Sequence, residues 1–358
     1  MVDSSEACNA PQSSAPPAHR AARIEDWAHA RRDRAARKRG HRETVIPYTG
    51  YGGDGWVRIL CRVLLSRPAE PQPASARARR RAERRGTGMR GWRSFTSVPV
   101  GYARVSVDVG GQSFELVADR GGVVDTVVQV GLTPGWHTAT LRTAESVAVE
   151  APLNVVDPAV TFGVLSDVDD TVMVTMLPRP LLAAWNTFVL DEHARIPTPG
   201  MAVLLDKLAN SRPGTPVIYL STGAWNVAPT LTRFLSRNLY PSGVLLLTDW
   251  GPTHDRLFRS GREHKRDNLN RLAAEFPNIR WLLVGDDGQH DEEHYRQFAL
   301  AHPDNVAAIA IRELSPGEAV LAGGRSKIED GYGGVPWAYA PDGSGLADQL
   351  TELGILKP

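Results

Sequence analysis

The chain has 358 residues, of which 41 are Lys or Arg and 40 are Asp or Glu, and 42% are hydrophobic. This composition excludes a wholly disordered or collagen-like chain, and the length indicates about two domains with additional tails. No apolar run approaches the roughly 18 residues that a membrane-spanning helix needs. Two cysteines are too few for a disulfide framework or a cysteine-based zinc site. We therefore expect a cytoplasmic protein without a transmembrane segment.

The net charge of +1 is the sum of opposite regional excesses. Residues 1–42 hold nine basic and five acidic residues, and residues 67–93 hold nine arginines and two glutamates. Residues 151–358, in contrast, hold 18 basic and 25 acidic residues. This asymmetry predicts different roles for the two halves of the chain. We expect residues 1–42 to form a disordered or partly helical basic tail.

Residues 43–155 predict a small antiparallel β-domain of the sandwich type. A strand-like run covers 56–65, and alternating apolar and polar residues flank Gly110-Gly111, as in a β-hairpin. The Arg-rich insert 67–93 interrupts this pattern and is too charged to be core. It is either a solvated loop or a surface for anionic lipid or, nonspecifically, nucleic acid. No nucleic-acid motif accompanies it, so we expect no specific nucleic-acid binding.

Residues 156–358 alternate buried-strand runs with amphipathic helices. Apolar residues repeat at helical spacing from Met201 to Leu208 and from Leu269 to Phe276. The predicted strands are Val160–Leu165, Pro216–Leu220, Gly243–Leu247, Arg280–Val284 and Val306–Ile311. Such alternation predicts a parallel sheet with helices on both faces, and therefore an α/β domain whose chemistry lies at the carboxyl ends of the strands.

Polar side chains gather where these strands end. A strand-end Asp alone is often a helix cap, and a single Ser is often a turn residue. Together, however, the groups could supply a nucleophile, a proton donor, a phosphate clamp and a metal cage. Three carboxylates within four positions repel one another if buried, and hard cations such as Mg²⁺ prefer oxygen ligands. The segments concerned are Ser166-Asp167-Val168-Asp169-Asp170-Thr171, Ser221-Thr222, Lys265 and Gly285-Asp286-Asp287-Gly288-Gln289-His290-Asp291.

These motifs make the sequence similar to the haloacid-dehalogenase superfamily of phosphohydrolases, whose first motif is Asp-x-Asp-x-Thr/Val. Residues 167–171 fit that motif, and Ser221, Lys265 and the pair Asp286 and Asp291 match the other three. More narrowly, "LSDVDDTV", "IYLSTGAWN", "LLLTDWG" and "LVGDDGQHDEEHY" resemble the catalytic domain of actin-patch-type phosphatidate phosphatases and their bacterial relatives. The resemblance covers about residues 158–356.

The chain departs from the expected family pattern at two places. It has Thr222-Gly223-Ala224 where Asn-Ser-Pro is expected, and Asp287 where Ser is expected. These changes leave the implied mechanism intact and put the substrate in doubt.

The resemblance implies a Rossmann-like phosphatase domain and Mg²⁺-dependent hydrolysis of phosphomonoesters through an aspartyl-phosphate. Asp167 would be the nucleophile, and Asp169 would serve as general acid and then as general base. The implied phosphate-binding residues are Thr171, Ser221, Thr222 and Lys265. The implied Mg²⁺ ligands are Asp167, the carbonyl of Asp169, and Asp286 or Asp291.

The leading hypothesis for the substrate is phosphatidate or a related lipid phosphate. The same chemistry on a phosphoprotein, a nucleotide or a soluble metabolite is an alternative, and a membrane- or partner-binding protein with marginal catalysis is another. Residues 172–199 are either a packed helix or an apolar lip for an acyl chain or membrane. We also expect Trp225, Trp250 and His254 to line the mouth of the active site. Peripheral contact with an anionic membrane through residues 67–93 would accompany a lipid substrate.

Overall fold

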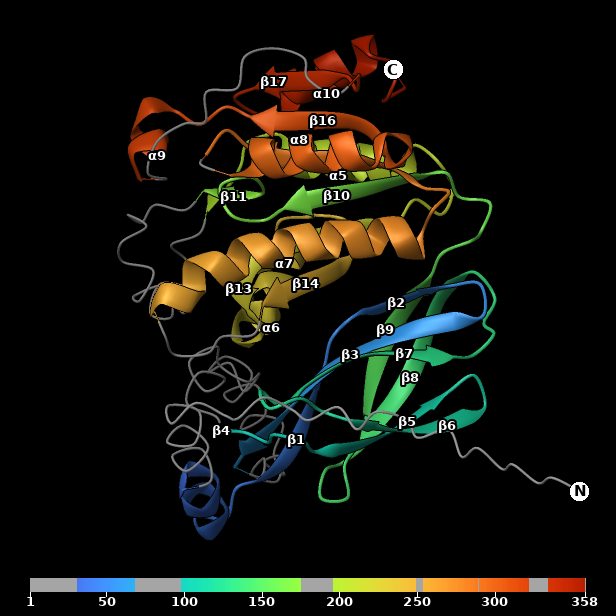
Figure 1. The fold of residues 1–358 in the computed structure, drawn as a ribbon, viewed down its shortest axis with the longest axis vertical. Coiled ribbons are helices and arrows are strands. Elements are labelled where there is room, and N and C mark those ends of the chain that lie inside the picture. The colour runs from blue at the N-terminus through green and yellow to red at the C-terminus, as the bar shows by residue number, and fades with distance from the viewer. Residues whose placement is uncertain are drawn as a thin grey trace, which may run out of the picture.

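The computed structural model describes residues 31–67, 98–174, 196–248, 254–288, 290–321 and 334–357. Within these ranges a β-rich part, strands β1–β9, is followed by an α/β part (Figure 1). The last strand of the β-rich part ends at Val155, and the first strand of the α/β part begins at Phe162. In the basic tail, a helix covers residues 31–38. The Arg-rich insert, apart from Arg67, lies outside the described residues.

The β-rich part is a nine-stranded sheet whose main path runs β1-β3-β2-β9-β8-β5-β6, with β4 and β7 also paired to β3. All of these pairings are antiparallel except β2 with β9, which is parallel. The predicted hairpin is confirmed as β5–β6, and its turn residues Gly110 and Gly111 have φ of 57° and 75°, as a tight hairpin turn requires. The strands are β1 (Arg42–Pro47), β2 (Gly50–Gly53), β3 (Trp56–Ser66), β4 (Val98–Pro99), β5 (Arg104–Val109), β6 (Gln112–Val117), β7 (Val123–Gln129), β8 (Gly135–Arg142) and β9 (Val149–Val155).

Strand β3 is buried on both faces. Its side chains alternate between two environments, because successive residues of a strand point to opposite sides. The odd positions, Val57 to Leu65, pack in a core made by the β-rich part alone. The even positions Leu60 and Leu64 instead join the core of the α/β part. Of the two cores, the one on the even face of β3 is therefore shared, because both parts of the molecule contribute side chains to it.

The α/β part is built on a six-stranded sheet in the order β14-β13-β10-β15-β16-β17, and every pairing in it is parallel. The five strands predicted from the sequence are confirmed with small shifts of their ends, and β17 is an additional edge strand. The strands are β10 (Phe162–Asp167), β13 (Val217–Ala224), β14 (Val244–Thr248), β15 (Arg280–Asp286), β16 (Val306–Arg312) and β17 (Trp337–Ala340).

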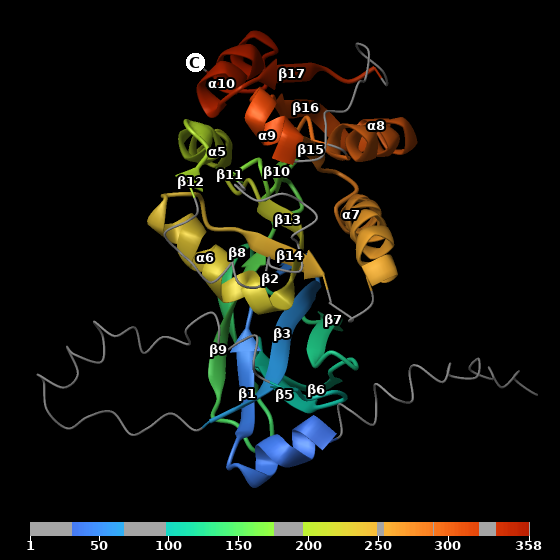
Figure 2. The ribbon, with the colours of Figure 1, turned by 90° about the vertical axis from the view of Figure 1, so that its left-hand side faces the viewer.

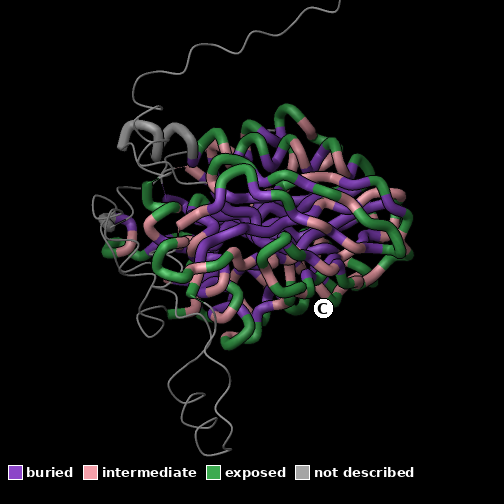
Figure 3. The backbone as a smooth tube through the Cα atoms, turned by 90° about the horizontal axis from the view of Figure 1, so that it is seen from below, coloured by how far each residue is buried: buried purple, intermediate pink, exposed green. Residues whose placement is uncertain are grey.

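Helices cover both faces of this parallel sheet, with α5 and α6 on one side and α7 and α8 on the other (Figure 2). The apolar residues predicted to repeat at helical spacing from Met201 and from Leu269 are buried on α5 and α7. Seen from below, buried residues (purple) fill the middle of the molecule, and exposed residues (green) lie toward its edges (Figure 3). The helices are α5 (Met201–Asn210), α6 (Ala228–Arg237), α7 (His254–Glu275), α8 (Asp291–Ala301), α9 (Pro316–Leu321) and α10 (Gly343–Glu352), with short 3-10 turns η2 (Trp225–Val227) and η3 (Pro303–Asn305).

The predicted insert 172–199 is described only at its two ends. There β11 (Met173–Val174) pairs with β12 (Ile196–Pro197), and residues 175–195 lie outside the described part of the chain. Among the helices that the structure describes, none combines the length and the apolar character needed to cross a bilayer.

The shared core predicts that a cavity under β3 weakens both parts of the molecule. Leu60 is 1% exposed, so Leu60→Ala should lower the free energy of unfolding by about 2–5 kcal/mol. Chemical denaturation followed by circular dichroism measures this loss. The control is Leu300→Ala on α8, where the side chain is 56% exposed and the expected loss is below about 0.5 kcal/mol. Equal losses in the two variants would contradict a shared core.

Candidate active site at the carboxyl ends of the parallel strands

The polar segments singled out in the sequence meet at one edge of the parallel sheet. Asp167 is the last residue of β10, Ser221 lies in the adjacent β13, and Asp286 is the last residue of β15 on the other side. Asp291 is the first residue of α8. Parallel strands end at the same edge, so side chains far apart in sequence converge there.

Asp167, Asp286 and Asp291 form a buried carboxylate cluster, each at most 5% exposed, whose oxygens lie within 4.8 Å of one another. Lys265, near the middle of α7, places its Nζ 2.5 Å from Oδ1 of Asp167 and 2.5 Å from Oδ1 of Asp291. One ammonium thus faces three carboxylates. The cluster keeps an excess of negative charge when all four groups are ionised.

That excess charge appears in the acid–base properties of the cluster. Burial, followed by repulsion from Asp291, raises the pKa of Asp167 well above its usual value, even though Lys265 lies beside it. Burial and the same neighbour also raise the pKa of Asp286. For Lys265, burial lowers the pKa, but attraction from Asp167 and Asp291 outweighs it and the net shift is upward. Lys265 therefore stays protonated in the site, and the remaining negative charge of the carboxylates favours a further positive charge.

The donor atoms of the cluster fit a divalent cation. Asp291 Oδ2 is buried and has no hydrogen-bond partner among the described residues, although Oδ1 of the same carboxylate binds Lys265. Asp286 Oδ1 accepts a bond of 2.7 Å from the backbone N–H of Gly288, which fixes its orientation. Hard divalent cations such as Mg²⁺ and Ca²⁺ take oxygen ligands of this kind.

The neighbouring Asp287 has a different position, although the sequence groups it with the acidic cluster. Its Oδ1 accepts the backbone N–H of Leu314 at 2.8 Å, and its own N–H donates to the carbonyl of Arg312. Asp287 therefore ties the end of β15 to the segment that follows β16. It thereby fixes the end of the strand that carries Asp286.

Asp169 and Ser221 face each other across the site. Ser221 Oγ donates to Asp169 Oδ2 at 3.0 Å and accepts the backbone N–H of Gly223 at 2.9 Å. Thr171 is fully buried, and its Oγ1 has no hydrogen-bond partner among the described residues. Thr222 is exposed, because it follows Ser221 along a strand and points to the other side. The structure thus brings Ser221 to Asp169, whereas the role predicted for Thr222 stays a prediction.

Arg312 is a buried residue beside the turn after Asp167 that was not predicted from the sequence. It ends β16 and is 4% exposed; its Nη1 donates to the carbonyl of Asp170 at 2.6 Å, and its Nη2 pairs with Glu318 at 2.7 Å. Asp170 has φ of 58°, an unusual conformation for a residue other than glycine. Arg312 therefore holds the turn between Asp169 and Thr171 in place. An arginine at the end of the otherwise apolar run "VAAIAIR" was the available signal.

Of the residues expected at the mouth, only Trp225 has a described side chain. It is 4% exposed and stacks on Tyr48 of the β-rich part, with ring centroids 4.5 Å apart. It therefore lies in the contact between the two parts, and the expectation that it lines an open mouth is wrong. Trp250 and the side chain of His254 lie outside what the structure describes.

Comparison with known proteins shows that the segment carrying this site is similar to a known catalytic domain. Residues 162–313 match the family model described as the catalytic domain of phosphatidate phosphatase APP1. A protein of Saccharomyces cerevisiae named phosphatidate phosphatase APP1 is 26% identical over 170 residues, which cover 47% of this chain and 28% of that protein. An uncharacterized protein of Schizosaccharomyces pombe is 24% identical over 161 residues, which cover 42% of this chain and 25% of that protein.

The matched segment contains every site residue predicted from the sequence, from Asp167 to Asp291. The chain spans about a quarter of the length of the two curated relatives. Among solved structures, a carbohydrate acetylesterase from Xanthomonas citri aligns at a TM-score of 0.28 and 10% identity, over 78% of this chain and 73% of that one, which is too weak to indicate a common fold.

The close packing at Gly285 yields a test of the site geometry. A Cβ at this position would lie 2.7 Å from the ring of Tyr295 and 2.9 Å from Asp291 Oδ2, so Gly285→Ala must displace the first turn of α8. We expect a loss of about 1–3 kcal/mol in the free energy of unfolding, measured by thermal denaturation. Gly131→Ala is the control, because no atom lies within 4 Å of its added Cβ. A Gly285→Ala protein as stable as this control would disprove the packing described for the site.

Proposed function

We propose that this chain, whose residues 162–313 carry an APP1-type phosphatidate phosphatase catalytic domain, is a phosphoric monoester hydrolase acting on phosphatidate or a related lipid phosphate. The observation that carries the proposal is the buried cluster of Asp167, Asp286, Asp291 and Lys265 within the matched segment. The lipid part of the proposal rests on the name of the yeast relative.

In the proposed reaction a carboxylate oxygen of Asp167 attacks the phosphorus atom and forms an aspartyl-phosphate, while the P–O bond to the alcohol breaks. Asp169 gives its proton to the departing alkoxide and then removes a proton from the water that hydrolyses the aspartyl-phosphate. The second step returns Asp167 as a carboxylate and releases inorganic phosphate. Ser221 donates its single hydroxyl hydrogen to Asp169 in the structure, and in the proposed reaction it turns this hydrogen toward the phosphate that enters.

Lys265 and Ser221 are the proposed ligands of the non-bridging phosphate oxygens. Lys265 is buried with its ammonium directed at the nucleophile, so a phosphate that reaches Asp167 also reaches this charge. Fixed donors aimed at the oxygens of a transferring phosphoryl group stabilise the charge of the transition state. The predicted contributions of Thr171 and Thr222 to phosphate binding belong to the same proposal.

A divalent cation, most simply Mg²⁺, is proposed to be held by Asp167, Asp286 and Asp291, with the carbonyl of Asp169 as a further ligand. The support is the unpartnered Asp291 Oδ2 and the raised pKa of two buried carboxyls, which burial and mutual repulsion cause. When bound, such a cation neutralises negative charge between the carboxylates and an approaching phosphate.

We also propose that the parallel sheet has the haloacid-dehalogenase topology and that the β-rich part is a sandwich-like domain over residues 43–155. Peripheral contact with an anionic membrane through residues 67–93 is proposed on their charge alone. The same chemistry on a phosphoprotein, a nucleotide or a soluble metabolite remains the alternative, since the residues near phosphorus do not distinguish these substrates.

A substrate panel with a nucleophile variant tests the activity. Wild-type protein should release phosphate from liposomal phosphatidate faster than from soluble phosphomonoesters, and Asp167→Asn should reduce kcat at least about a thousandfold on every substrate. The control is Asp304→Asn, which should retain activity. Asp304 is exposed and lies in η3, at the amino ends of the parallel strands and away from the active site. Full activity of Asp167→Asn would refute the covalent route, and a preference for a soluble ester would refute the lipid substrate.

Metal binding can be tested without measuring turnover. Mg²⁺ at a hundred times its dissociation constant should stabilise the wild-type protein by about 2.7 kcal/mol, observed as a rise in Tm that EDTA reverses. Asp286→Asn should abolish most of that rise and, without metal, should be at least as stable as wild type, because one buried like charge is removed. Asp348→Asn on α10, which is exposed, should respond to Mg²⁺ like the wild type. An unchanged response of Asp286→Asn would exclude this carboxylate as a ligand.

A further inference from the structure

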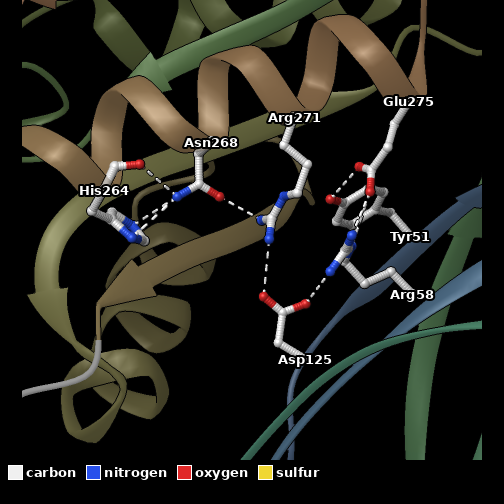
Figure 4. Close-up of polar contacts among 7 residues, drawn as sticks. All are labelled: Tyr51, Arg58, Asp125, His264, Asn268, Arg271 and Glu275. Carbon is white, nitrogen blue, oxygen red and sulfur yellow. Dashed lines mark hydrogen bonds and ion pairs between the residues drawn. The ribbon is translucent and has the colours of Figure 1, made fainter. Parts of the chain in front are cut away.

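Helix α7 presents two neighbouring stripes to two different partners. Each stripe follows the spacing i, i+4, i+7 and i+11, so each runs along one side of the helix. The first stripe faces the parallel sheet and begins with the lysine of the active site: Lys265, Leu269, Leu272 and Phe276, the last one residue beyond the helix. The second stripe is polar, and its last two members pair with residues of the β-rich part: His264, Asn268, Arg271 and Glu275 (Figure 4).

Asp125 of β7 is the central contact of the polar stripe. Its Oδ2 lies 3.0 Å from Nη1 of Arg271, and its Oδ1 lies 2.5 Å from Nη1 of Arg58 on β3. Arg58 in turn pairs with Glu275 at 2.5 Å, and Glu275 accepts a bond of 2.7 Å from the hydroxyl of Tyr51. Three strands of the β-rich part, β2, β3 and β7, therefore contact α7 at two positions, Arg271 and Glu275.

The groups of this network are unequally buried. The side chains of Arg58 and Glu275 are 13% and 15% exposed, whereas those of Arg271 and Asp125 are 24% and 34% exposed. Tyr51 and Trp56 also pack against Phe276, with ring centroids 6.0 Å and 5.6 Å apart. The Arg271–Asp125 pair is partly open to water, and its strength comes from the network in which Asp125 also pairs with Arg58, which in turn pairs with Glu275.

A second contact of the β-rich part is made with the 3-10 turn η2, which follows the strand that carries Ser221. The hydroxyl of Tyr48 donates to the carbonyl of Trp225 at 3.1 Å, and their rings are stacked. Arg62 of β3 is 7% exposed and donates from Nη1 to Oδ1 of Asn226. These partners lie four and five residues beyond Ser221.

We propose that the β-rich part positions both phosphate-binding groups of the active site, Lys265 and Ser221. Asp125 acts on Lys265 through Arg271 and helix α7. Tyr48 and Arg62 act on Ser221 through the turn at Trp225 and Asn226. Arg271 follows Lys265 by six residues, about 9 Å along a helix. Because a helix is stiff over this distance, a small rotation of α7 at Arg271 also moves the ammonium of Lys265. The inference rests on the proposed function, because it assigns Lys265 and Ser221 to phosphate.

The first test compares Asp125→Asn with the control Asp108→Asn. Asp108 pairs with Arg142 at 3.9 Å within the β-rich part, so its replacement makes the same charge change away from α7. For Asp125→Asn we expect the KM for p-nitrophenyl phosphate and the inhibition constant of orthovanadate to rise about tenfold. Partial unfolding would lower kcat through loss of folded protein and leave both constants unchanged.

Two further variants keep the test decisive. Asp125→Glu keeps the charge and should recover most of the wild-type values, whereas Tyr48→Phe keeps the ring stack and removes only the bond to Trp225. We expect Tyr48→Phe to raise the same two constants through the Ser221 loop, by a smaller factor. Wild-type constants in Asp125→Asn, or equal changes in Asp108→Asn, would overturn the proposal.

Hydrogen–deuterium exchange separates this proposal from the proposed function. Amides of α7 around residues 262–271 should exchange about tenfold faster in Asp125→Asn than in wild type or Asp108→Asn. This readout does not depend on any phosphatase activity of the wild-type protein. Unchanged protection of α7 would overturn the positioning role, whereas faster exchange in a protein that hydrolyses no phosphate ester would refute only the proposed function.

Discussion

The contact of Lys265 with Asp167 and Asp291 is the constraint around which the site is arranged. Charges this deeply buried are costly to remove from water, and each one depends on its partners for compensation. One ammonium offsets only part of the charge of three carboxylates. The elements that carry these groups, β10, β15, α7 and α8, must therefore be held at fixed distances by the rest of the molecule.

The parallel sheet provides the first part of that support. Its central strand β10 ends at Asp167 with β13 and β15 on either side, so hydrogen-bonded neighbours fix the spacing of three polar segments. The β-rich part provides the second, because β3 sends side chains toward both α7 and the turn after Ser221. The active site thus depends on residues that are remote from it in sequence and make no contact with its carboxylates.

The sequence predicted much of the α/β part because its signals are local. Strand runs and apolar spacings report burial directly, and the residues at the strand ends were placed together by the rule for parallel sheets. The polar stripe of α7 could not be interpreted in the same way. Arg271 and Glu275 have the composition of a solvent-exposed face, and only the tertiary structure shows that Arg58 and Asp125 cover it. Arg312 was missed for the same reason, since its partner Asp170 lies 142 residues away.

The alternation of side chains between the two faces of β3 limits how its sequence can change in evolution. Odd side chains fill one core, while even positions such as Arg58, Leu60 and Arg62 meet α7, the second core and the Ser221 loop. Inserting or deleting one residue inside this strand would turn every following side chain to the wrong side. Both neighbours would then lose their contacts together. Length changes in related chains should therefore be confined to the segments on either side of β3, and the strand itself should vary by substitution only.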